Sequence, residues 1–375
     1  MSIQQGKFSQ SLIRLSVGAI AILAVSAVLL AADRGSRNGG QAPKPGRMPQ
    51  VALIQHASVE PLDNGVQGIL DSLAQRGYEH GRNINIIRYN AQGDFATANT
   101  IAKAVVGDDL DLIITASTLS MQTVAAANRT QAKPKPHLFG IVTNPFDAGV
   151  GASKENPLEH PPYLAGLGSN SPVRDLFELA VRLQPSIRTI GLVWNPAEAS
   201  SEASTLLARD VVKDLGLILM EGSAENSSGA GEVAKSLLAR GIDALWLSTD
   251  VTTTTAQDVM IKAATQAGIP VIASMPTAAD HGALLALGSS YYMVGLEQGQ
   301  MAADVLQGRD LATIPIINWT PAVLRLNLNG LDRLQRLWTI PADVRLRAQT
   351  IFDANGVTKQ DTPLAEVPEQ LRWNR

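Results

Sequence analysis

Short apolar runs and helical patterns alternate along the chain from residue 51 onward. Residues 51–55 (VALIQ) form one apolar run, and residues 62–76 carry apolar side chains at the spacing of one helix face. The same alternation predicts strands at residues 83–89, 110–115 and 137–142 and helices at residues 95–106 and 119–128. Strands that are apolar throughout are typical of parallel sheets covered by helices on both faces. The first half is therefore predicted to be an α/β lobe.

The second half repeats this order of elements. It predicts helices at residues 173–183, 202–215, 232–240 and 257–267, alternating with strands at residues 189–194, 217–220, 244–247 and 271–273. Each half also contains a helix that ends at Gly, then an acidic residue, then an apolar strand that ends in Ser or Thr: VVGDDLDLIITAST and LLARGIDALWLSTD. We therefore predict two similar Rossmann-like lobes with parallel sheets.

Two candidate strands, at residues 283–288 and 324–328, come after the second lobe would be complete. Such strands can cross between lobes and form a multi-strand hinge. The predicted boundaries assign residues 50–165 and about 289–322 to lobe 1, residues 166–288 and about 323–352 to lobe 2, and residues 353–375 to a C-terminal tail.

The N-terminus carries an uncharged apolar segment, residues 15–32, behind Lys7 and Arg14. As a helix it would be ~27 Å long, enough to cross a bilayer. We predict that residues 1–33 are either a signal peptide or an uncleaved membrane anchor made of an apolar helix, and that the Gly/Pro-rich residues 34–49 are a linker. Both alternatives predict export, with the lobes in the periplasm or at the outer face of the cytoplasmic membrane.

Composition excludes several classes of function. The net charge of −3 comes without a basic cluster, so we expect no nucleic-acid partner. The absence of Cys excludes disulfides, thiolate nucleophiles and a lipid-modified cysteine. The five His residues lack the spacing of metal ligands, and no phosphate-binding loop or G-x-S-x-G motif occurs. We therefore expect no catalytic residue, no metal site, no cofactor and no enzyme activity.

Small polar residues gather where the predicted strands end. In open parallel sheets, ligands bind at the carboxyl ends of the strands, beside helix N-termini whose free N–H groups attract anions. Taken alone, each Ser or Thr among these residues is better explained as a helix cap than as a ligand contact. Their recurrence in both lobes favours a polar cleft, whose candidate ligand-binding residues are His56, Thr118, Ser120, Thr143, Asn144, Asn195, Ser200, Ser201, Thr249, Asp250 and Ser274.

Several segments carry a family resemblance, including GVQGILDSLAQRGYEHGRNINIIRYNAQGD, LDLIITASTLSMQTVAAA and GIPVIASMPTAADHGALLALG. Together they resemble the ABC transporter substrate-binding proteins that include tryptophan and tyrosine binders. The resemblance covers about residues 51–352 and implies a type I periplasmic-binding fold. The chain departs from the family at Asn144-Pro145, where Asp-Pro is usual, and at residues 163–166 (YLAG), where Asn-x-Thr-Gly is usual. Both departures are expected near the crevice.

The resemblance implies a monomer that closes on a small polar ligand, an amino acid with aromatic ones among the candidates, and delivers it to an ABC permease in the membrane. We expect Asp250 to meet the ligand ammonium and the helix starts at Ser120 and Ser200 to meet its carboxylate. Trp194 is expected either to pack in the core or to offer its ring to the ligand, as Tyr291 and Tyr292 also could. A membrane-tethered sensing module would use the same fold and remains the alternative.

Overall fold

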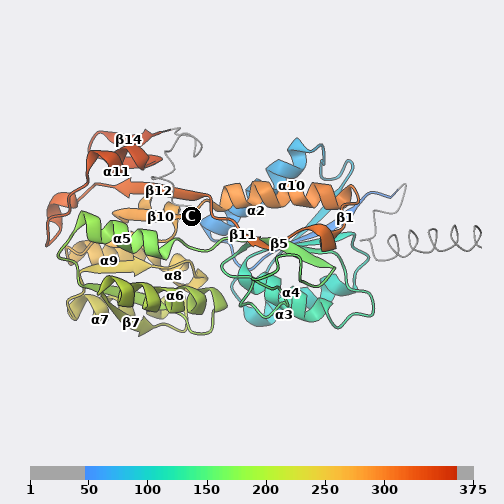
Figure 1. Cartoon of the computed structure of the whole chain (residues 1–375), viewed down its shortest axis with the longest axis horizontal. Helices are drawn as coiled ribbons and strands as arrows, with labels where there is room; N and C mark the ends of the chain where they lie inside the picture. The colour runs from blue at the N-terminus through green and yellow to red at the C-terminus, as the bar shows by residue number, and fades with distance from the viewer. Residues whose placement is uncertain (1–46, 361–375) are drawn as a thin grey trace, which may run out of the picture. The chain divides into compact units, whose positions relative to one another are not determined.

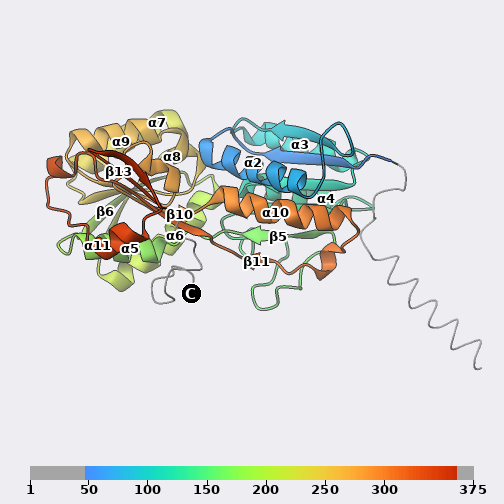
Figure 2. The same cartoon turned by 90° about the horizontal axis from the view of Figure 1, so that it is seen from above.

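The computed structural model describes residues 47–360, which belong to one compact unit. The predicted signal peptide or anchor, residues 1–33, lies outside this range, and so does most of the predicted tail. Among the described helices, none has the length and apolar character needed to cross a membrane. Two β-sheets with helices on both faces organise the unit (Figures 1 and 2).

The first sheet defines lobe 1 and is entirely parallel. Its strand order is β11-β5-β4-β3-β1-β2. The strands are β1 (Gln50–Gln55), β2 (Asn85–Asn90), β3 (Leu112–Ala116), β4 (His137–Val142), β5 (Leu164–Gly168) and β11 (Ile317–Asn318). The helices are α2 (Glu60–Gln75), α3 (Phe95–Gly107), α4 (Thr118–Asn128) and α10 (Tyr291–Leu306).

The pleat of β1 divides the lobe 1 core into two layers. Val51 and Leu53 point to one face, where they pack with residues of α2 and α10. Ala52 and Ile54 point to the other face, where they pack with residues of α3 and α4. Because alternate side chains of a strand face opposite sides, a continuously apolar strand is buried on both. Figure 2 shows α2 and α10 side by side along the sheet.

The second sheet defines lobe 2 and is mixed. Its order is β14-β13-β12-β10-β9-β8-β6-β7, with β12 antiparallel to β10 and β14 antiparallel to β13. The strands are β6 (Thr189–Trp194), β7 (Ile218–Ser223), β8 (Ala244–Leu247), β9 (Val271–Ala273), β10 (Leu285–Ser289), β12 (Ala322–Asn327), β13 (Thr350–Asp353) and β14 (Gly356–Lys359). The helices are α5 (Val173–Leu183), α6 (Ala199–Leu215), α7 (Ser227–Ala239), α8 (Val251–Thr255), α9 (Gln257–Gln266) and α11 (Ala342–Arg347).

Three connections join the two sheets within the described range. The chain passes from β5 to α5, from β10 to α10 and from β11 to β12. Two α/β lobes with mostly parallel sheets and several crossings confirm the predicted fold class, that of the type I periplasmic-binding proteins. Two details differ from the predicted boundaries: β5 extends lobe 1 to Gly168 instead of Ala165, and β14 places residues of the predicted tail in the lobe 2 sheet.

Candidate ligand-binding site

A cavity lies between the lobes, at the carboxyl ends of their strands. The inner cavity holds about 570 Å³ of space free of protein atoms, part of it open to solvent, and is lined by residues that follow β1, β3 and β4 in lobe 1 and β6, β8 and β9 in lobe 2. A wider outer crevice of about 1430 Å³ adjoins it. Five residues line both spaces and so form the boundary between them: His56, Val59, Leu119, Glu198 and Val251.

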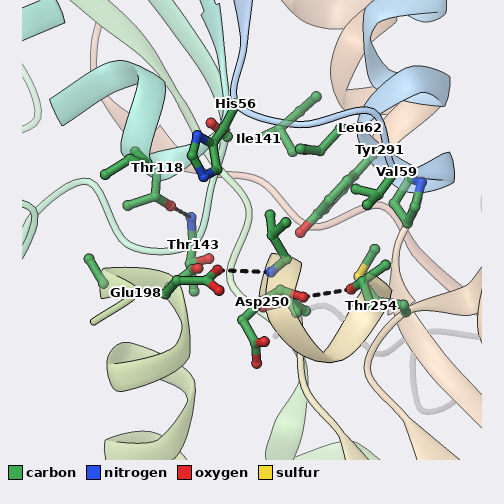
Figure 3. A pocket seen from close by; sticks show the side chains of 18 residues that line it. His56, Val59, Leu62, Thr118, Ile141, Thr143, Glu198, Asp250, Thr254 and Tyr291 are labelled. Carbon is green, nitrogen blue, oxygen red and sulfur yellow. Dashed lines mark hydrogen bonds between the residues drawn. The ribbon is translucent and has the colours of Figure 1, made fainter. Parts of the chain in front are cut away.

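The walls of the inner cavity are largely apolar on the lobe 1 side. Val59, Leu62, Ile141 and Tyr291 contribute side chains there (Figure 3). Ile141 has a φ of 57°, a conformation that costs energy for a β-branched residue, where β4 loses its regular register against β5. Gly65 of α2 makes room for it, since a Cβ there would lie 2.1 Å from Ile141 Cδ1. Local strain of this kind clusters at functional sites.

Two helix N-termini from different lobes reach the cavity. Thr118 and Leu119 begin α4 in lobe 1, and Ala199 and Ser200 begin α6 in lobe 2. First-turn N–H groups have no partner inside their own helix, so they are available to an anion. The Thr118 hydroxyl also accepts a hydrogen bond from the N–H of Thr143 at 3.1 Å, which ties the loop after β3 to the end of β4.

The third helix start at the cavity, that of α8, already has a partner. Glu198 accepts hydrogen bonds from the backbone N–H of Val251 at 2.9 Å and of Thr252 at 3.0 Å. The Thr252 hydroxyl donates to the same carboxylate at 2.5 Å and accepts from the Asn195 side-chain amide at 2.9 Å. Glu198 therefore links the starts of α6 and α8 and carries its charge at the cavity wall.

Asp250 does not have the surroundings expected for an ammonium ligand. Its carboxylate accepts from the N–H of Thr253 at 2.7 Å, from the Ser201 hydroxyl at 3.1 Å and from the Ser248 hydroxyl. Asp250 is among the residues that line the inner cavity, but it is fully buried, and Figure 3 shows its carboxylate pointing away from the centre of that space. Burial and the negative charge of Glu198 raise the pKa of Asp250 to about 6. The structure thus gives Asp250 the role of N-cap of α8.

The other predicted residues divide into two groups. His56, Thr118, Thr143, Ser200 and Thr249 line the inner cavity, and Asn195 lines the outer crevice. Four are absent from the lining of both spaces because their side chains serve the fold: Ser120 pairs with Ser117, Ser201 with Asp250, Ser274 with Trp246, and Asn144 with Asp147.

The aromatic residues separate in a similar way. Trp194 packs against the lobe 2 core, and the Arg209 guanidinium lies 5.6 Å from the centre of its ring. Tyr291, in contrast, lines the cavity. Burial raises the pKa of its hydroxyl to about 12, although a hydrogen bond to Thr249 acts in the opposite direction. Ala165, one of the departures from the family, is buried in lobe 1 and absent from the lining of both spaces.

Sequence reasoning did not predict the apolar wall. In the sequence, the residues of this wall look like ordinary core residues: Val59, Leu62, Ile141 and Met275. They line one cavity only because β4 bends and the two lobes approach each other. Glu198 was not among the predicted site residues, although it lies in the loop that follows a strand. An acidic residue directly before a helix is the sequence feature that could have identified it. Within residues 47–360, no group of three or more His, Cys, Asp or Glu residues could hold a metal ion.

Comparison with known proteins agrees with this architecture. A family model described as ABC transporter substrate binding protein matches residues 50–350. A tyrosine-binding protein from Clostridioides difficile is 31% identical over 282 residues, which cover 75% of this chain and 79% of the relative.

Solved structures give the same result for the fold. A conserved domain protein from Vibrio cholerae matches with a TM-score of 0.75 at 28% identity, covering 81% of this chain and 100% of that one. A protein from Streptococcus pneumonia, solved in complex with L-Trp, matches with a TM-score of 0.74 at 22% identity over the same shares of the two chains. With a family match across most of its length, the chain belongs to the ABC transporter substrate-binding protein family.

Proposed function

We propose that this protein is the extracytoplasmic solute-binding component of an ABC importer and that its ligand is an aromatic amino acid. The observation that carries the proposal is the cavity between the lobes, in which an apolar wall faces two helix N-termini. The names of two similar proteins support the ligand class, since one binds tyrosine and the other was solved with L-Trp.

The polar end of such a ligand would lie at the helix starts. A carboxylate placed between Thr118 of α4 and Ser200 of α6 would meet unpaired N–H groups from both lobes. Glu198 lies on the same wall and offers a negative charge to the ammonium group. Asp250 is unsuited to this contact because its carboxylate is fully buried and points away from the centre of the cavity.

Hinge closure follows from this division of contacts. A ligand whose carboxylate bridges α4 and α6 binds both lobes together only when they approach, so it shifts the population toward the closed arrangement. In the proposed function the closed monomer then docks on a membrane permease. Export of the lobes rests on the apolar segment at residues 15–32.

A thermal-shift screen of the full chain against the amino acids tests the ligand class. A ligand at 100 times its Kd stabilises a protein by ~2.7 kcal/mol, so tyrosine, tryptophan or phenylalanine should raise Tm clearly. A chain that responds to none of them, or that responds equally to all amino acids, would contradict the proposed ligand. Loss of uptake of the identified ligand in cells that lack this protein tests the import role.

A further inference from the structure

His56 lies at the boundary between the inner cavity and the outer crevice. It follows directly after β1, and its side chain is only 5% exposed although it lines both spaces. Figure 3 shows the imidazole ring projecting into the cavity between Thr118 and Ile141, with Glu198 on the opposite side. A nearly buried polar ring therefore faces the place where a ligand would lie.

One nitrogen of this ring lacks a partner. Among the atoms of residues 47–360, Nδ1 of His56 is buried and makes no hydrogen bond. His137 shares this property, but its ring lies inside the lobe 1 sheet, where Nε2 pairs with the Thr115 hydroxyl at 2.9 Å. Because buried polar atoms are nearly always paired in native proteins, the unpaired Nδ1 of a ring that lines the cavity indicates a partner that residues 47–360 do not supply.

The ring is held in its neutral form. Burial lowers the pKa of His56, and the nearby charge of Asp94 at the start of α3 opposes this only in part. Glu198 and Tyr291 are further ionisable groups on the cavity wall. A neutral imidazole offers one donor and one acceptor, and no hydrogen bond from another residue in the range 47–360 fixes which nitrogen carries the proton. His56 can therefore accept a hydrogen bond from a hydroxyl or N–H group or donate one to an oxygen.

Resting on the proposed function, we propose that His56 is the specificity-determining residue that hydrogen-bonds the ring substituent of the ligand. The site would then select aromatic amino acids whose ring carries a hydroxyl or N–H group, and reject phenylalanine. The positions of the contacts support this assignment. The helix starts of α4 and α6 account for the carboxylate, whereas the apolar side chains beside His56, Leu62 and Ile141, suit an aromatic ring.

Bound phenylalanine would leave the His56 ring without a hydrogen-bond partner, and this is the source of the expected selectivity. A site with a buried hydrogen-bonding group discriminates strongly against a ligand that lacks the matching group, more strongly than an apolar pocket discriminates by size. We therefore expect the wild-type protein to bind tyrosine or tryptophan at least about tenfold more tightly than phenylalanine.

Calorimetric titration of the full chain with L-tyrosine, L-tryptophan and L-phenylalanine tests the assignment through the ratio of Kd values. His56→Leu, which removes both ring nitrogens, should bring the phenylalanine-to-tyrosine and phenylalanine-to-tryptophan ratios to within about threefold of unity, and His56→Asn should retain part of the preference. His80→Leu, a change at an exposed histidine that does not line the cavity, is the matched control and should leave the ratios unchanged.

The outcomes separate the two proposals. If His56→Leu folds and keeps the wild-type ratios, His56 does not recognise the ring and this inference fails while the proposed function stands. If wild-type protein binds none of the three amino acids, both fail together. Should His56→Leu not fold, His56→Ala provides the same comparison, and a preference for tyrosine or tryptophan that persists in it would overturn the inference.

Discussion

Asp250 is a buried carboxylate that accepts hydrogen bonds from three donors and whose ionised form is nevertheless disfavoured. Three donors surround it, and all three favour its ionised form. Complete burial and the negative charge of Glu198 act in the opposite direction and prevail, so its pKa rises from 3.8 to about 6. Because the folded-state pKa lies above the unfolded value, the contribution of Asp250 to stability is fully present at low pH and is lost as pH rises through about 6.

Asp250→Asn should remove this loss. Asn is as good an N-cap as Asp and carries no charge, so the variant should gain stability relative to wild type between about pH 5 and pH 7.5, by at most about 3 kcal/mol. Urea unfolding at both pH values measures the difference. Asp94→Asn is a suitable control, because Asp94 caps α3 in the same way but is exposed and has a lowered pKa. A gain that is independent of pH would contradict this account of Asp250.

The polar half of the site could be predicted from the sequence because it depends on a local rule. Ser, Thr or Asn after an apolar strand marks a strand exit, and the exits of parallel strands meet at one edge. The same rule could not separate ligand-facing residues from caps, as Ser120 and Ser274 show by bonding inward. The apolar half could not be predicted, since the direction of Ile141 depends on a register shift that involves β5.

Helices α2 and α10 pack closely because glycines lie where they touch. A Cβ on Gly295 of α10 would lie 2.0 Å from the carbonyl oxygen of Gly65 in α2, and a Cβ on Gly68 would lie 2.2 Å from the carbonyl oxygen of Tyr292. These neighbours are backbone atoms and cannot rotate away. Close approach of the two helices is therefore possible only without side chains at these positions, and it also places Tyr291 at the cavity.

Gly295→Ala should consequently destabilise the protein by about 3 kcal/mol or more, because α2 and α10 would have to separate. Gly107→Ala is the matched control. Gly107 ends α3, nothing lies within 4 Å of where its Cβ would be, and we expect a change within about 0.5 kcal/mol or a slight gain. Chemical denaturation of both variants measures the effect, and equal stabilities would show that the helix contact tolerates a methyl group.

Elements with a regular pattern were predicted to within a few residues, and the failures have physical causes. Helix α10 escaped prediction because Gly295 and Gly299, which its packing requires, weaken its helical pattern. Strand β5, with the sequence LAGLG, contains two glycines and reads as a loop. In both cases tertiary packing selects residues that local propensity disfavours.

Three connections join the two lobes within residues 47–360, and these segments are where a hinge motion of one lobe against the other would take place. A contact between the lobes that lies away from the hinge therefore forms only when the two lobes come close to each other. One such contact joins Glu60, at the start of α2, to the Nε2 atom of His281 in lobe 2, at 3.4 Å. The other ring nitrogen of His281 lies 2.6 Å from Asp258 of α9, which holds the ring in place.

This contact should make ligand affinity depend on a residue pair that the ligand does not touch. Glu60 and His281 belong to different lobes, so an attraction between them adds to closure. Exposed pairs of this kind contribute about 0.2–1 kcal/mol, which corresponds to a factor of about 1.5 to 5 in Kd.

Tyrosine Kd values for Glu60→Gln, His281→Asn and the double variant give the coupling by a double-mutant cycle. We expect the coupling to shrink in about 1 M salt, because exposed charges are screened. Strictly additive effects of the two substitutions would show that the pair does not assist closure.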